Sequence, residues 1–519
     1  MQIKDIKPGY KGKLILKVLV ERIIQTGGPT VFVVSDGTGN LSLKGFVKPG
    51  QRAFAELNEG DALSVNTLIG EFQGELEGEI LNLSKLKDQE KEKFMKGVLE
   101  LERKRAKVES VDFFVKSKVL DKLKDSMIKA AEEIRLAVIQ SRPIIVRHHN
   151  DTDGYCSGFA LERAILPLIE KQHSTAKAPW EFFTRSPSAA PYYELTDSII
   201  DTAFSLRNVA KFSNKMPLVV IADNGSSPED LMAIKQGKIH GADFIVVDHH
   251  GFDKDVISKE VLVHINPFLV GESGSSFSAG MLCGELAHLI NKDVQNLEQI
   301  PALAGLADRI DIEDPKIVED YLKIAKKRGY SKELLRDISL VVEYVSTRVR
   351  FMEVREYIEV LFGEPREKQK ELVGLMAPYI RKLDAKGLAI GKANAQLEKI
   401  GKTTLQIIDI DKTFPGFGFF PKPGRSVGLV HDSLSHGDDP KGPQKQKIPL
   451  VSIGLMNTAI TIRATDEANF SVHKLIEFLE KKLPNAFVEG GGHKNAGSIN
   501  FIPNKKDEVM KYFREFVGK

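Results

Sequence analysis

Apolar residues are spaced differently in successive parts of the chain, and the spacing predicts different elements. Residues 1–87 contain short runs of branched and aromatic side chains, separated by turn residues such as Gly27-Gly28-Pro29. Several short strands within fewer than about 90 residues are typical of a small β-barrel, and an OB-fold fits this rhythm of strands and turns best. A small β-domain that serves only for packing is the alternative.

The rest of the chain alternates helical and mixed segments. Residues 88–140 have a repeat near 3.6, many charged side chains and no proline, which predicts a helical connector. Between 141 and 316, continuous Val- and Ile-rich runs alternate with helical stretches. Such runs indicate strands buried on both faces, so we predict an α/β fold with a parallel sheet flanked by helices. A helical linker region over 317–400 and a smaller α/β domain over 401–519 follow, the latter with a turn-rich surface loop at 436–443.

Composition narrows the class of protein. The 519 residues are 42% apolar and 28% charged, which is enough to form several cores and argues against disorder. Cys156 and Cys283 cannot form a disulfide framework, the amino terminus lacks the profile of a signal peptide, and no apolar run reaches about 18 residues. We therefore predict a soluble cytoplasmic protein without a membrane span. The net charge of +3 does not by itself indicate a nucleic-acid partner.

Four short stretches carry acidic or imidazole side chains, and each closes an apolar run that we interpret as a buried strand. They are residues 149–154, 223–225, 248–250 and Asp308. In open parallel sheets, ligands bind just beyond the carboxyl ends of the strands. Hard divalent ions take oxygen ligands, and Mn²⁺ also accepts histidine nitrogen. The pattern therefore predicts a two-metal site of the kind that cleaves phosphoesters, and thus a metal-dependent hydrolase.

The individual motifs differ in weight. Asp151 and Asp153, with Gly154 permitting a sharp turn, can bracket a pair of ions, although such a motif alone is more often a helix cap or an Asx-turn. The triplet at 248–250 is more informative, because unpaired burial of three ionisable groups at a sheet edge would be costly. Asp223, beside small residues, is the candidate carboxylate shared by two ions about 3.5–4 Å apart.

The ordered combination of motifs resembles a known family. His-x-Asp-x-Asp-Gly, Asp-x-Gly, Asp-His-His and the Asp after Gly305-Leu306-Ala307 resemble the DHH phosphoesterase superfamily. Gly491-Gly492-His493 followed by Ala496-Gly497 is similar to the glycine-rich signature of the associated C-terminal domain. The two resemblances together cover about residues 141–519. Chains that add a β-barrel to both domains are similar to the RecJ-like single-strand exonucleases, particularly the archaeal type.

The resemblance implies a specific set of metal ligands for two Mn²⁺ or Mg²⁺ ions. One ion would be held by His149 and Asp151, the second by Asp153, His249 and Asp308, with Asp223 bridging. His250 would face the scissile phosphate, and Asp248 would orient the neighbouring imidazole. Bacterial RecJ sequences commonly begin the first motif with Asp, whereas this chain has His149, which favours Mn²⁺ over Mg²⁺.

The resemblance also implies that the C-terminal domain grips substrate phosphate, through Arg463, Gly491, Gly492 and His493. Glycines let backbone N–H groups approach an anion, and arginine and histidine add charge-assisted hydrogen bonds. A glycine run alone is more often a turn, but its position between an apolar run and Ala496-Gly497 favours a binding role. The site would then lie in a cleft between the two α/β domains that admits one strand and not a duplex.

The leading functional prediction is an exonuclease that hydrolyses single-stranded DNA or RNA to nucleotides. The barrel would extend the binding track, with Phe32, Phe46 and Phe54 as stacking candidates beside Lys44 and Lys48, although Phe in such a domain is more often core.

Two alternatives stay open. One is a phosphodiesterase for dinucleotides and other short substrates, which smaller superfamily members cleave. The other is a scaffold associated with replication, which the presence of every expected ligand disfavours. Single-stranded nucleic acid and replication or repair proteins are the predicted partners.

Overall fold

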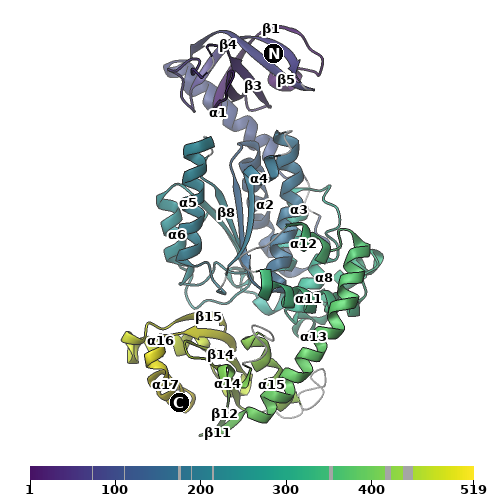
Figure 1. The fold of residues 1–519 in the computed structure, drawn as a ribbon, viewed down its shortest axis with the longest axis vertical. Coiled ribbons are helices and arrows are strands. Elements are labelled where there is room, and N and C mark those ends of the chain that lie inside the picture. The colour runs from purple at the N-terminus through teal and green to yellow at the C-terminus, as the bar shows by residue number, and fades with distance from the viewer. Residues whose placement is uncertain are drawn as a thin grey trace.

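The computed structural model describes residues 1–48, 50–72, 74–109, 112–173, 177–188, 190–212, 215–349, 355–414, 422–436 and 448–519. The loop predicted at 436–443 lies outside these residues, apart from His436 at the end of a helix. Three parts follow one another along the long axis: a β-barrel, a central α/β domain and a C-terminal α/β domain (Figure 1). The predicted fold class is confirmed.

The N-terminal part is a closed five-stranded barrel in the order β1-β2-β3-β5-β4. Its strands are β1 (Gly12–Gln25), β2 (Thr30–Ser35), β3 (Asn40–Gly45), β4 (Ala62–Phe72) and β5 (Glu75–Lys85). Phe32 is only 1% exposed and Phe54 packs against it, so both belong to the barrel core and the prediction that they form stacking platforms is wrong. Phe46 is 58% exposed, and the sequence analysis missed Phe72, which is also exposed and has the Lys44 ammonium 4.5 Å from its ring centre.

Two helices follow the barrel, α1 (Asp88–Ala106) and α2 (Lys118–Ile139). Leu120, Leu123 and Ile134 of α2 are fully buried in the core of the central domain. The second helix of the predicted connector therefore packs as part of that domain.

The central domain is built on a five-stranded, all-parallel sheet in the order β10-β9-β8-β6-β7. The strands are β6 (Ile144–His149), β7 (Phe183–Ser188), β8 (Leu218–Ala222), β9 (Asp243–Val247) and β10 (Val263–Ile265). All five residues of β8 are buried, as the continuous apolar run predicts. The polar edge strand β7 was not predicted, because its sequence Phe-Thr-Arg-Ser-Pro-Ser has no apolar run.

Helices cover both faces of this sheet. They include α3 (Thr152–His173), α4 (Ala178–Phe182), α5 (Leu195–Phe212), α6 (Asp230–Ile239), α7 (Ala279–Ile290) and α8 (Ile300–Ala307). In Figure 1, α5 and α6 lie on one side of the sheet, and α2 and α3 lie on the other.

The predicted helical linker region contains α9 (Ile310–Glu313), α10 (Pro315–Lys327), α11 (Lys332–Val349), α12 (Arg355–Leu361) and α13 (Arg366–Asn394). The last of these has 29 residues, so it is about 43 Å long. It runs from the central domain to the far end of the C-terminal domain (Figure 1). No helix in the described parts of the chain is long and apolar enough to cross a bilayer.

The C-terminal domain has a six-stranded sheet in the order β11-β12-β13-β14-β16-β15. The strands are β11 (Gln396–Ile400), β12 (Thr403–Asp409), β13 (Leu450–Leu455), β14 (Ala459–Ala464), β15 (Glu489–His493) and β16 (Ala496–Asn500). Its helices are α14 (Ile410–Thr413), α15 (Pro423–His436), α16 (Val472–Lys482) and α17 (Lys506–Val517). The edge strand β15 faces the central domain (Figure 1).

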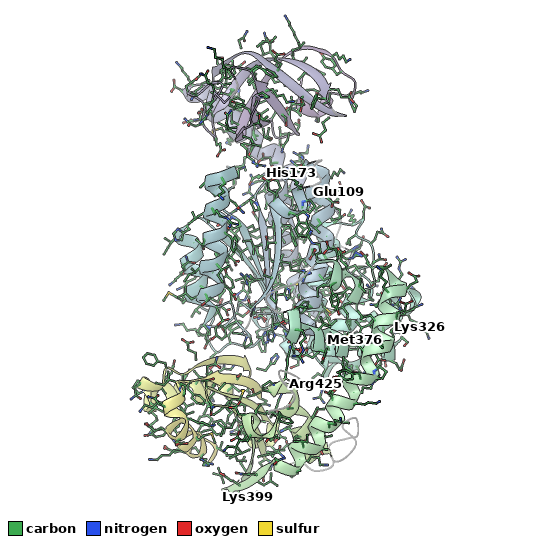
Figure 2. The ribbon with its side chains drawn as sticks, in the orientation of Figure 1. Glu109, His173, Lys326, Met376, Lys399 and Arg425 are labelled. Atoms are coloured by element: carbon green, nitrogen blue, oxygen red, sulfur yellow. The ribbon has the colours of Figure 1, made fainter. Side chains whose placement is uncertain are left out.

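The two ends of the central domain meet different neighbours. The barrel contacts residues that precede strands: Asn40 approaches Ser141, and Arg22 pairs with Glu181 at 2.5 Å. The C-terminal domain lies at the opposite end, beyond the carboxyl ends of the strands. Figure 2 shows His173 at the barrel end and Arg425 near the C-terminal domain.

Candidate metal centre

Three strands of the central sheet deliver ionisable side chains to the same edge. His149 is the last residue of β6, Asp223 follows β8, and Asp248 follows β9. Asp223 has a left-handed backbone (φ 59°), and its N–H donates to the Val247 carbonyl at 2.9 Å. Because these strands are parallel and adjacent, residues far apart in the sequence converge at their carboxyl ends.

Helix α3 begins directly against the end of β6. A Cβ on Gly154 would lie 2.1 Å from the His149 carbonyl oxygen, so only glycine permits this approach. Asp153 in the first turn of α3 is thereby brought beneath the strand ends. Its Oδ1 accepts hydrogen bonds from Ser278 Oγ (2.6 Å) and from the N–H of Gly280 (3.1 Å) at the start of α7. Sequence reasoning missed Ser278, for which the only signal was a Ser preceding a helix of small residues.

Asp308 follows a helix, which corrects the prediction that it closes a strand. It caps α8, whose eight residues Ile-Pro-Ala-Leu-Ala-Gly-Leu-Ala are almost all buried. A short apolar run can be a buried helix or a buried strand, and periodicity does not separate the two. Helix α8 packs against α3 and α7 and still brings Asp308 to the same site.

One histidine faces three of the carboxylates. His249 Nε2 lies 3.4 Å from Asp223 Oδ1, 3.5 Å from Asp308 Oδ2 and 3.9 Å from Asp153 Oδ2. Its other nitrogen, Nδ1, is 3.1 Å from the Gly274 carbonyl, which can only accept a hydrogen bond. The ring proton therefore lies on Nδ1, and Nε2 faces the carboxylates.

The second group of ligand atoms shares Asp223 with the first. His149 Nδ1 lies 2.9 Å from Asp151 Oδ2 and 3.5 Å from Asp223 Oδ2. Asp223 thus directs Oδ1 towards His249 and Oδ2 towards His149. The structure brings together all six residues that the resemblance implies as ligands, in two groups with Asp223 in both.

The ligand atoms fit a pair of divalent cations. Oδ2 of Asp153, Oδ2 of Asp223 and Nδ1 of His149 are buried without a hydrogen-bond partner among the described residues. Buried polar atoms are normally paired, so unpaired oxygen and nitrogen atoms gathered in one place indicate a cation site. Carboxylates with imidazole are a donor set that suits Mn²⁺ well and also accommodates Mg²⁺ through the oxygens.

The pKa values express the same excess of negative charge. Burial, together with the charges of Asp223 and Asp308, raises the pKa of Asp153 well above its usual value. Burial and the Asp223 charge raise the pKa of Asp308 to about 6, despite the opposing effect of His249. Burial lowers the pKa of His249, but the charges of Asp308 and the other carboxylates outweigh it and raise that pKa. Bound cations would replace these protons.

Asp248 positions the neighbouring histidine rather than joining the ligands of the first group. It is 1% exposed, and its Oδ1 accepts from His250 Nδ1 at 2.7 Å and from the N–H of His249 at 2.8 Å. Burial raises the pKa of Asp248, but the charge and hydrogen bond of His250 outweigh it and hold that pKa below the usual range. The carboxylate thus stays ionised and favours the protonated form of His250.

The C-terminal domain completes the site with one histidine. The ring of His493, at the end of β15, stacks on His250 with centroids 4.6 Å apart and planes inclined at 24°. Its centroid lies 5.2 Å from that of His249. Burial, together with the charges of His250 and His249, lowers the pKa of His493 well below its usual value.

The predicted glycine cradle is an edge strand. Gly491 and Gly492 pair with Ser498 and Gly497 of β16, and Gly492 has φ 122°. A Cβ on Gly492 would lie 2.6 Å from the Ala496 carbonyl oxygen, so the hairpin requires glycine there. Gly491 faces Tyr192 of the central domain, at 3.9 Å from a Cβ built on it. The glycines therefore permit close approach of two domains.

Arg463 lies in β14, and two further basic residues join the domains. Burial lowers the pKa of Arg463, whereas the nearby charges of Asp432 and Asp308 raise it, so this arginine lies close to the metal centre. Lys422 donates to the Asn150 carbonyl at 2.7 Å, and Arg309 pairs with Asp432 at 3.1 Å. Sequence reasoning missed Lys422 and Arg309, because nothing in their local sequence signals a partner in another domain.

Comparison with known proteins places this architecture. No family model matches the chain. An uncharacterized protein of Methanocaldococcus jannaschii is 35% identical over 551 residues, which span 99% of this chain and 70% of that protein. The structure of a DHH domain from a member of a family of ribosomal proteins is 35% identical, with a TM-score of 0.74, and covers 82% of this chain and 98% of that one. The chain belongs to the DHH family.

A more distant structure is RecJ from Thermus thermophilus in complex with Mn²⁺, at 13% identity and a TM-score of 0.49, covering 79% of this chain and 56% of that one. Membership of the DHH family and the grouped carboxylates and imidazoles together support a metal-dependent phosphoesterase.

Proposed function

We propose that this DHH protein is a two-metal exonuclease that hydrolyses single-stranded DNA or RNA to nucleotides. The observation that carries the proposal is Asp223, whose two oxygens face two different groups of ligands. When bound, two Mn²⁺ or Mg²⁺ ions supply a nucleophilic water at neutral pH and offset the charge of the phosphoryl oxygens. His149 and Asp151 hold one ion, Asp153, His249 and Asp308 hold the other, and Asp223 bridges them.

His250 acts on the substrate phosphate. Its Nδ1 is engaged by Asp248, so the protonated ring is fixed in orientation and offers its remaining N–H to an anion. A positioned imidazolium stabilises the charge that develops on a phosphoryl oxygen as the diester is attacked. Asp248 is a positioning residue in this scheme because it acts through His250.

The C-terminal domain holds the strand in place. Arg463 and His493 bind phosphate from the side opposite the metal centre, and the glycines of β15 allow a backbone to come close. The contact of His493 with His250 makes the cleft narrow, which supports a single strand as substrate.

The barrel supplies the outer part of the track. Phe46 and Phe72 are exposed aromatic rings near Lys44, the combination that stacks bases and neutralises phosphates in single-strand binding proteins. This replaces Phe32 and Phe54, which are core residues.

Digestion of oligonucleotides labelled at either end tests the proposal. Wild type with Mn²⁺ should shorten single-stranded DNA or RNA progressively, and the label released first gives the polarity. Asp223→Ala should lose about a thousandfold or more in rate. Asp253→Ala, at an exposed aspartate just beyond the histidine pair, is the matched control and should digest like wild type.

Two results would contradict the proposal. Equal digestion by wild type and Asp223→Ala would show that the metal assignment is wrong. Faster turnover of a dinucleotide than of a long oligonucleotide would favour the short-substrate alternative.

A further inference from the structure

Helix α5 has its polar and apolar faces reversed relative to an ordinary surface helix. Its buried side chains are all polar: Asp197, Ser198, Asp201, Thr202 and Ser205. Its exposed side chains include Leu195, Ile199, Ile200, Phe204 and Leu206. An amphipathic helix of a globular domain normally turns its apolar stripe to the core. The apolar face of α5 therefore does not stabilise the central domain.

A buried ion-pair network holds the inner face of α5 instead. Arg147, in the middle of β6, donates to Asp197 Oδ1 at 3.0 Å and to Asp201 Oδ1 at 2.6 Å. Tyr193 donates its hydroxyl to Asp201 Oδ2 at 3.0 Å, and Ser198 Oγ donates to the Ala233 carbonyl of α6 at 2.7 Å. Polar residues at these positions are thus explained by the fold, whereas the apolar residues on the outside are not.

The apolar surface continues onto the neighbouring helix. Met232 and Ile239 of α6 are exposed, Ile239 to 81%, and Phe204 of α5 is exposed to 52%. Figure 1 shows the two helices side by side on the flank of the sheet, away from the C-terminal domain. The α5–α6 face is defined here by Ile199, Ile200, Phe204, Leu206, Met232 and Ile239. Contiguous exposed apolar side chains of this kind mark interaction sites.

The charges around this face have one sign. Within residues 195–211 and 230–239, every exposed charged side chain is a cation: Arg207, Lys211, Lys235 and Lys238. The carboxylates of the two helices, Asp197, Asp201 and Asp230, are all buried. Lys238 pairs with Glu260 at 2.9 Å, whereas Arg207 lies over the Phe204 ring at 4.5 Å. An occupant with apolar groups flanked by carboxylates complements this face.

We propose that the α5–α6 face docks an acidic amphipathic helix of a partner protein. Isoleucine, leucine and methionine side chains suit the apolar stripe of a helix laid across the two helices, and the flanking cations pair with its Glu or Asp residues. A second copy of this chain would bring Arg207 and Lys211 against the same cations. A nucleic acid would use the cations and leave the aliphatic side chains without a function.

The proposed docking site is separate from the metal centre. It lies on the flank of the central sheet, whereas the metal ligands lie at the carboxyl edge facing the C-terminal domain (Figure 1). A partner on this face therefore leaves the metal centre open to substrate.

A displayed library of amphipathic helices of about five turns tests the proposal. The library fixes a leucine stripe and encodes Glu or Lys at each flanking position, and the full-length protein is the bait. Helices rich in Glu should be enriched, and a synthesised member should bind with a measurable Kd by fluorescence anisotropy. Phe204→Glu should weaken that binding at least about tenfold, since it removes an apolar contact and introduces repulsion.

Leu375→Glu is the matched control, because Leu375 is a highly exposed apolar residue on α13, outside this face. It should bind the peptide like wild type. Both variants should keep the wild-type unfolding temperature and nuclease rate, which shows that a loss of binding is not a loss of folding. A second variant, Ile200→Glu, should reproduce the effect of Phe204→Glu.

Four outcomes would overturn the proposal. These are enrichment of Lys-rich helices, absence of any enrichment over Phe204→Glu as bait, a concentration-dependent dimer that Phe204→Glu dissociates, and binding of an oligonucleotide that Phe204→Glu abolishes while the peptide has no effect. The third would assign the face to a second copy and the fourth to nucleic acid.

Discussion

The central domain contains two buried ionic clusters that are neutralised in different ways. In the cluster around Arg147, both oxygens of Asp201 accept from the guanidinium, and a tyrosine hydroxyl adds a further bond. In the metal centre, Asp153 and Asp223 each have a buried oxygen without a hydrogen-bond partner in the described chain. The number of charges does not distinguish a structural cluster from a functional one. What distinguishes them is whether the chain supplies the cations itself.

Glu285 of α7 shows a third way to neutralise a buried carboxylate. It is fully buried and accepts from the Tyr321 hydroxyl at 2.6 Å and from the Phe114 N–H at 2.8 Å, both of which are neutral donors. Burial raises its pKa to about 7. A guanidinium, a pair of metal ions and a proton thus serve the same electrostatic purpose at three places in one domain, and each makes a different prediction.

The largest effect is expected at the metal centre. Asp153→Asn should lower the nuclease rate about a thousandfold, because the second ion loses a charged ligand. The metal-free variant should nevertheless unfold at a higher temperature than metal-free wild type, since the repulsion with Asp223 and Asp308 is removed. Activity assays and thermal unfolding in chelator measure the two effects. A metal-free variant that is less stable than wild type would contradict this account of the cage.

Removal of the guanidinium should have the opposite effect on stability. Arg147→Ala leaves Asp197 and Asp201 buried without their cation, and should lower the free energy of unfolding by about 3–5 kcal/mol. Urea denaturation measures the change. Arg207→Ala, at an exposed arginine of the neighbouring helix, should change it by less than about 0.5 kcal/mol. Equal effects of the two substitutions would refute the structural role of Arg147.

The protonated carboxyl predicts a pH dependence. The pKa of Glu285 is about 7 in the folded state against 4.5 as its ordinary value, so the unfolded state releases the proton first as pH rises. Its contribution to stability is therefore fully present below pH 4.5 and is lost as pH rises through 7, by at most about 3 kcal/mol. Glu285→Gln should flatten the change in urea midpoint between about pH 5 and about pH 8. An unchanged slope would place the proton elsewhere.

The smallest effect is the gain from metal binding itself. Mn²⁺ at about a hundred times its Kd should raise the free energy of unfolding by about 2.7 kcal/mol, and a chelator should reverse the gain. Arg147→Ala should keep most of this shift, whereas Asp153→Asn should lose most of it. If both variants lost it equally, the two clusters would form one unit.

The amino-acid sequence predicts the centre of this molecule better than its periphery. Strands β6, β8 and β9 are continuous apolar runs, and an acidic or histidine residue directly after each can only lie at the sheet edge. That local relation is enough to bring His149, Asp223 and His249 together. Asp308 was assigned to the right site and the wrong element, because α8 is too short for its period to be seen.

Features that depend on distant partners could not be predicted. The reversed polarity of α5 depends on Arg147, about 50 residues earlier in the chain, and no local pattern reveals that pairing. The stacking of His493 on His250 depends on how two domains meet. The choice between Phe46 and Phe32 as exposed rings depends on the closure of the barrel, which decides the face to which each strand position points.

The position of the barrel sets a condition on substrate length. It contacts the central domain at the amino ends of the strands, so a strand bound to it must run along the whole sheet before its terminus reaches the metal centre. Once digestion has shortened the strand below that span, the barrel loses contact while cleavage continues. The enzyme would then act as a ruler, with a break in affinity at a fixed number of remaining nucleotides.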